Sequence, residues 1–162
     1  MTPQQPIVSP RPTWEAPEDL PCFELVEDYA ILACGIVWSV PHGYQFPGAH
    51  LPRALWTALT YPADPLIMAA SLVHDFNYFT HWQTRDLTDQ AFREILLSCG
   101  IPPIQARLMY EAVVEWGASY WTNTKEDAAY LELIRTRLIA EGADISPFGF
   151  PELSGIAEQL NM

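Results

Sequence analysis

Prolines decide where this chain can form regular structure, and they crowd its beginning. Six of the 15 prolines lie within residues 1–21. Because proline fixes φ and lacks an amide donor, this segment can form neither a helix nor a central strand. We predict an extended arm, partly of polyproline type, that is either a loose tail or a strap along a neighbouring subunit. Its apolar residues Ile7, Val8 and Trp14 are the candidates for binding that partner.

The segment after the arm, residues 22–40, predicts a small β-hairpin. Apolar and acidic residues alternate in its first half, and the turn is expected near Ala33–Gly35. Because an isolated hairpin is marginally stable, it has to pack on helices. Residues 41–56 are rich in glycine and proline and predict a loop, with a short helix from Pro52 to about Leu59.

The remainder of the chain has a helical period. From Leu66 onward, apolar residues recur three and four positions apart. The pattern predicts four helices, from Leu66 to just before His81, from Thr84–Asp86 to Cys99, from Ile104 to Ala118, and from Thr124 to about Ala140. The expected fold class is mainly α within α+β, about a four-helix bundle with a small N-terminal hairpin and an extended arm.

The length and charge of the chain limit its expected domains, partners and location. We expect an arm at 1–21, one helical domain at 22–142 and a C-terminal tail at 143–162. The formal net charge of −12 repels phosphate backbones, so nucleic acid is not an expected partner. No apolar run approaches the roughly 18 residues that cross a bilayer, and no signal peptide is visible. We expect the protein in a cytoplasm or in a particle assembled there.

Polar residues interrupt the first long helix at "HDFNY". His74 and Tyr78 are four residues apart and share a face of the helix, whereas Asp75 points about 100° away from His74. A site built on this helix therefore needs groups from other elements. The candidates are Asp89 on the following helix and a histidine, His50 or His42, in the preceding loop.

Three interpretations of this motif stay open. In the first, His74 is the general base of a hydrolase, Asp89 and Tyr78 support it, and Asp75 binds Ca²⁺ or another divalent cation. The "HDFNY" spacing resembles the HDxxY motif of the secreted calcium-dependent phospholipases. In the second interpretation, a metal-dependent phosphohydrolase binds its ion through one loop histidine with His74, Asp75 and Asp127.

The third interpretation is structural and requires no cofactor. His74 and Asp75 would then form a buried network with an arginine, for which Arg53 and Arg85 are the candidates. Tyr78 would be ordinary amphipathic packing.

Four blocks of the sequence resemble a known family. "SVPHGYQFPGAHLPRALW" is similar to VPxGFxTDxASxPRxxW, and "AASLVHDFNYF" is similar to AAxxHDxxY. "TRDLTDQAFREILLSCGIP" and "ARLMYEAVVEWG" are similar to SRxxADxxFxxAMxxxGVP and RxxMYxAVxxxG. Together the blocks resemble a family of small phage and prophage proteins, domain of unknown function thirteen-fifty-three.

The resemblance implies a phage origin and assigns no activity. The chain departs from the family pattern in the loop block, where Phe46–Pro47 replaces TD and His50 replaces the serine. This departure favours a non-enzymatic virion or tail component that binds other phage structural proteins or a second copy of itself, in the virion or the host cytoplasm. The alternatives are a cation-dependent hydrolase used in lysis or entry, and an acidic inhibitor of a host defence protein.

Overall fold

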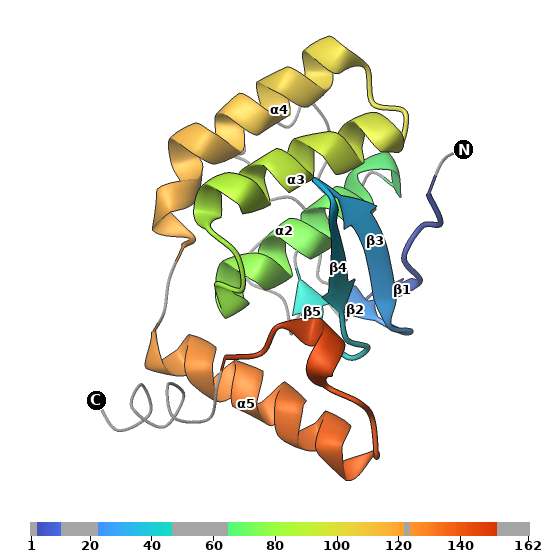
Figure 1. The fold of residues 1–162 in the computed structure, drawn as a ribbon, viewed down its shortest axis with the longest axis vertical. Helices are drawn as coiled ribbons and strands as arrows, with labels where there is room; N and C mark the ends of the chain where they lie inside the picture. Colours follow the sequence, from blue (N-terminus) through green and yellow to red (C-terminus); the bar gives the residue numbers. More distant parts are fainter. Residues whose placement is uncertain (1–2, 11–22, 47–64, 122–123, 152–162) are drawn as a thin grey trace.

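The structure combines helices with small antiparallel sheets, which confirms the mixed class with helix predominating (Figure 1). It is a computed structural model that describes residues 3–10, 23–46, 65–121 and 124–151. Several predicted features lie outside these ranges. They are Trp14, His50, Arg53, Pro47 and the short helix from Pro52.

The sheets lie at the N-terminal end of the chain. One sheet has the order β1-β2-β5, formed by Val8–Pro10, Phe23–Leu25 and Gln45–Phe46. The second joins β3, Tyr29–Ala33, to β4, Ile36–Val40, through a two-residue turn. Gly35 in that turn has a φ of 72°, a value that glycine adopts without steric cost. The described part of the arm thus pairs with its own chain, as an edge strand that tolerates proline.

The helical layer holds α2, α3 and α4 side by side, with α3 between the other two (Figure 1). A short 3-10 turn, η2 at Pro65–Ile67, leads into α2 at Met68–Thr80. The next two helices are α3, Arg85–Ser98, and α4, Pro103–Trp116, which is extended by a turn, η3, at Gly117–Ser119. Thr84 caps α3 by accepting a hydrogen bond from the Leu87 amide, and Pro103 begins α4 in the first-turn position that suits proline.

The last long helix, α5 at Lys125–Ala140, packs against α2 rather than joining the α2–α4 layer (Figure 1). Its start is fixed by a capping box between Thr124 and Asp127. The chain then returns through η4, Ser146–Phe148, to contact β4. Because α2 has α3, both sheets and α5 as neighbours, nearly all of its side chains are buried. The polar residues of "HDFNY" therefore lie in the protein interior.

Candidate functional site

Polar side chains of α2 and α3 meet in the interior between these two helices. His74 is 7% exposed and Asp89 is 2% exposed, and the His74 Nε2 atom lies 2.7 Å from Asp89 Oδ1. Phe92 and Tyr78 flank the imidazole, with ring centroids 5.0 Å and 4.1 Å from it. Because a buried carboxylate is costly unless it is hydrogen-bonded, this pairing explains how α3 tolerates Asp89 in its buried face.

Tyr78 completes the hydrogen bonding of Asp89. Its hydroxyl donates to the same oxygen, Oδ1, over 2.6 Å. Burial and this hydrogen bond both raise the pKa of Tyr78 well above its ordinary value, so the phenol stays protonated and remains a donor. The i and i+4 spacing on α2, which placed His74 and Tyr78 on one face, thus directs two donors onto one carboxylate.

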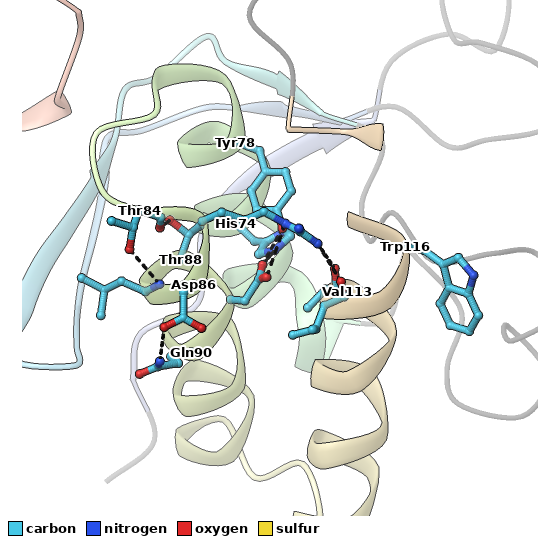
Figure 2. A network of polar contacts seen from close by, with 12 residues as sticks. His74, Tyr78, Thr84, Asp86, Thr88, Gln90, Val113 and Trp116 are labelled. Carbon is cyan, nitrogen blue, oxygen red and sulfur yellow. Dashed lines mark hydrogen bonds and ion pairs between the residues drawn. The ribbon is translucent and has the colours of Figure 1, made fainter. Parts of the chain in front are cut away.

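Arg85 connects this pair of helices to a third. Its Nε donates to the Tyr78 hydroxyl over 3.2 Å and lies 3.8 Å from Asp89 Oδ2. One of its terminal nitrogens donates to the Val114 carbonyl near the end of α4, over 2.7 Å. The same nitrogen lies 3.4 Å from the carbonyl of Val113, which Figure 2 labels. The guanidinium therefore fixes the positions of α2, α3 and α4 around Asp89. We call His74, Tyr78, Arg85 and Asp89 the buried network.

Gly117 leaves room for this arrangement. A Cβ atom at this position would lie 2.6 Å from the Tyr78 hydroxyl and 3.2 Å from an Arg85 nitrogen. The first distance is too short for a carbon–oxygen contact and the second is tight, so a side chain at this position would displace the Tyr78 hydroxyl. The turn after α4 packs closely against the buried network, and this close packing explains the glycine at position 117.

Asp75 lies in a different environment from His74, as their angular separation on the helix requires. It is buried, and its Oδ2 accepts a hydrogen bond from the hydroxyl of Tyr44, just ahead of β5. Burial and the charge of Asp75 raise the pKa of Tyr44, so this phenol also stays protonated. Of the predicted network of His74 and Asp75 with an arginine, the structure places Arg85 beside Asp89 and gives Asp75 a tyrosine donor, whereas Arg53 lies outside the described residues.

The other predicted site residues that the structure describes, His42 and Asp127, do not gather here. His42 lies near the end of β4, with both ring nitrogens on the carboxylates of Asp28 and Glu141. Asp127 belongs to the capping box of α5. Within residues 3–10, 23–46, 65–121 and 124–151, no three His, Cys, Asp or Glu side chains are grouped so that they could hold a metal ion. Of the predicted partner-binding residues, Val8 packs on the protein's own core, whereas Ile7 is exposed.

The hydrogen bonds of the buried network fix the chemistry of the imidazole. An ionised carboxylate can only accept, so the proton in the His74–Asp89 hydrogen bond belongs to His74 Nε2. In a neutral imidazole the other nitrogen, Nδ1, then carries a lone pair. Nδ1 has no hydrogen-bond partner among the described residues. The arrangement is that of a histidine oriented by a carboxylate, which can accept a proton at Nδ1.

Sequence reasoning identified His74, Tyr78, Asp89 and Arg85 but missed three other contributors. They are Tyr44, Gly117 and the carbonyl group of Val114. A backbone carbonyl has no signature in the sequence. Tyr44 lies 31 positions before Asp75, and a tyrosine in a turn-rich loop gives no sign of a buried carboxylate partner. A glycine between two helical segments suggests a close approach without saying to what.

Comparisons with known proteins identify one family and one relative. Residues 23–113 match the model of a family described as "Protein of unknown function (DUF1353)". A protein of Sinorhizobium fredii (strain NBRC 101917 / NGR234), "Uncharacterized protein y4jT", is 31% identical over 106 residues. That match covers 65% of this chain and 32% of the relative, so the chain spans about a third of the length of the relative it matches. No solved structure matches the chain.

The part of the chain that the structure describes contains no helix both long enough and apolar enough to cross a membrane.

Proposed function

This chain belongs to the DUF1353 family, and we propose that it is a hydrolase in which His74 activates a water molecule. The observation that carries the proposal is the 2.7 Å contact between His74 Nε2 and Asp89 in the protein interior. Asp89 orients the ring and stabilises the imidazolium that forms when Nδ1 takes a proton from water. Tyr78 and Arg85 hold the Asp89 carboxylate in place.

The bond to be cleaved is an ester. Water that has lost a proton to Nδ1 attacks the ester carbon or phosphorus, and the imidazolium returns the proton to the leaving alcohol. The "HDFNY" motif resembles that of the calcium-dependent phospholipases, which makes the carboxylic ester of a phospholipid the first substrate to test and a phosphoester the second.

Asp75 is the described carboxylate on α2 that could serve a divalent cation such as Ca²⁺, an ion that prefers oxygen ligands. Its Oδ2 already accepts from Tyr44, and the described residues supply no group of three ligands for a metal. The described residues alone therefore do not form a cation site. The assay is run with and without Ca²⁺ to test its effect.

The test is ester hydrolysis by the full chain. Fatty acid release from phosphatidylglycerol vesicles and phosphate release from a phosphodiester are each measured with added Ca²⁺ and with a chelator. His74→Gln is expected to lose about 100-fold or more of the rate, the typical contribution of a general base. His81→Gln serves as a matched control, because His81 stacks on Trp121 outside the buried network. Equal rates for His74→Gln and the wild type, or no hydrolysis by the wild type under any condition, would contradict the proposal.

A second candidate function is a non-enzymatic component of a phage particle that binds other phage proteins or further copies of this chain. The observation that favours it is the contact of Arg85 with the Val114 carbonyl, because it makes the buried network a joint between three helices. Such a network would stabilise the fold without acting on a substrate.

Two results separate this role from the hydrolase. Mass spectrometry of purified particles should find the chain as a stoichiometric component, and His74→Gln should lower the free energy of unfolding while the wild type hydrolyses no ester. Absence of the chain from particles would contradict the assembly role.

A further inference from the structure

Helix α5 lies beyond the family-matched residues, yet it contacts four consecutive residues that precede the site. These are residues 42–45, which follow β4 and include the first residue of β5. The Arg137 guanidinium donates to the His42 carbonyl over 2.8 Å, and the Tyr130 hydroxyl accepts from the Gln45 amide over 2.9 Å. At Gly43, φ is 84° and a Cβ atom would lie 2.1 Å from an Arg137 nitrogen, so only glycine allows this approach.

His42 joins the segment to α5 through two carboxylates. Its Nδ1 lies 2.7 Å from Asp28 Oδ1, and its Nε2 lies 2.6 Å from Glu141 Oε2 at the end of α5. Asp28 Oδ1 also accepts from the His42 backbone amide, over 2.8 Å. Because each carboxylate can only accept, both ring nitrogens donate when the imidazole is protonated. The neutral ring has one proton and can satisfy one carboxylate only.

The segment held in this way carries Tyr44, whose hydroxyl donates to Asp75. The Tyr44 and Tyr130 rings also pack together, with centroids 6.1 Å apart. Glu141 and Arg137 hold residues 42 and 43, and Tyr130 holds residues 44 and 45. The contacts between α5 and residues 42–45 therefore fix both the position of α5 and the hydrogen bond from Tyr44 to Asp75.

We propose that His42 is a proton-dependent clasp, which fixes α5 on residues 42–45 when protonated and thereby holds Tyr44 on Asp75. The clasp consists of His42, Asp28 and Glu141. Among the described residues, Arg137 also contacts it, with its Nε 3.8 Å from Glu141 Oε1. The His42 side chain is 31% exposed, so it exchanges protons with bulk solvent. The clasp depends on the fold alone and operates whether or not His74 acts on a substrate.

The direction of the pH effect follows from the charges. The hydrogen bonds to Asp28 and Glu141 raise the pKa of His42 above its ordinary value. A group whose folded-state pKa is raised stabilises the folded protein below its unfolded-state pKa, and this contribution is lost as pH rises through the folded-state pKa. The clasp is therefore closed in mildly acidic solution and opens as the pH increases.

The test combines an NMR titration of His42 with hydrogen exchange on the full chain. In the wild type, His42 should titrate at a higher pH than a histidine in an unfolded peptide. Glu141→Gln should lower that midpoint, whereas the matched control Glu111→Gln, an exposed carboxylate paired with Arg107 on α4, should not move it. In hydrogen exchange at mildly acidic pH, His42→Gln should lose protection at the Gln45 amide and in α5.

Two results would overturn the clasp. One is a wild-type His42 that titrates where an unfolded histidine does. The other is protection of the Gln45 amide and α5 that depends on pH in the same way in the wild type and in His42→Gln. If His42→Gln fails to fold, Glu141→Gln provides the same exchange comparison, because it removes one charge and leaves the histidine in place.

Discussion

Two histidine–aspartate pairs in this protein have the same N–O distance and opposite surroundings. His74 and Asp89 are 2.7 Å apart in the interior, and so are His42 and Asp28 on the surface. The side chains of the first pair are 8% and 3% exposed, and those of the second are 31% and 53% exposed. The inner histidine has one carboxylate partner among the described residues, and the outer histidine has two.

The comparison shows how burial affects the strength of a histidine–aspartate contact, and how the number of carboxylate partners affects the protonation of the ring. In the interior, removing one charged partner leaves the others without compensation, so the geometry is strongly held. On the surface, water screens the same contact and replaces a lost partner. One carboxylate leaves a ring nitrogen available as a base, whereas two carboxylates favour the doubly protonated ring. The first arrangement suits catalysis or structure, and the second suits a response to pH.

The largest expected effect is on the inner pair. Asp89→Ala leaves His74, Tyr78 and Arg85 without their acceptor, and we expect a loss of about 3–5 kcal/mol in the free energy of unfolding. Asp28→Ala, the matched change in the outer pair, should cost about 1 kcal/mol or less. Urea denaturation of both variants at neutral pH measures the two values. Equal losses would contradict the claim that burial distinguishes the pairs.

The next effect concerns the tyrosine that shares Asp89 with His74. Tyr78→Phe removes a donor to a charged group, and a loss of about 1.5–3 kcal/mol is expected. Tyr110→Phe is a suitable control, because this ring is only partly buried and lies beneath Arg93. A Tyr78→Phe variant as stable as this control would show that the hydroxyl does not support Asp89.

A smaller loss is expected from crowding the buried network. Gly117→Ala introduces a Cβ close to the Tyr78 hydroxyl and Arg85, and overpacking of this kind costs about 1–3 kcal/mol. Ala118→Ser, one position further and exposed, controls for the change of residue in the same turn. Thermal unfolding compares the stability of the two variants. A Gly117→Ala protein as stable as the wild type would mean that residue 117 does not pack closely against Tyr78 and Arg85.

The smallest effect belongs to the outer pair and depends on pH. Because the pKa of His42 is raised in the folded state, the melting temperature of the wild type should exceed that of His42→Gln at mildly acidic pH. The gap should close as the pH rises through the folded-state value. Calorimetry from mildly acidic to alkaline pH measures this difference in melting temperature. A difference that stays constant with pH would mean that His42 has a purely steric role.

Much of this arrangement could be predicted from the sequence, because it is local. Helical spacing and cap residues placed α2 to α5 within a few residues, with Thr124 and the acidic residues after it marking the start of α5. The four sequence blocks predicted the family, which the match over residues 23–113 confirms. The i and i+4 relation predicted a shared face for His74 and Tyr78, and the structure places both side chains on Asp89, one helix further along the chain.

The rest could not be predicted, because it depends on contacts between distant segments. His42 is 14 residues from Asp28 and 99 residues from Glu141, and no local pattern links the three. The pairing of β1 with β2 joins the arm to the domain across a segment that gives no register signal. The helical period of α2 predicted a helix, but it gave no sign that neighbouring elements would cover this helix on nearly all sides.

The tautomer of His74 shows most directly whether Asp89 orients this imidazole as a base. Long-range proton–nitrogen NMR of the imidazole distinguishes the two tautomers of the neutral ring. The geometry predicts that Nε2 carries the proton toward Asp89 and that Nδ1 is unprotonated, and Asp89→Asn should weaken this preference. A neutral His74 with its proton on Nδ1 would contradict the account, because such a ring has no base to offer at that nitrogen.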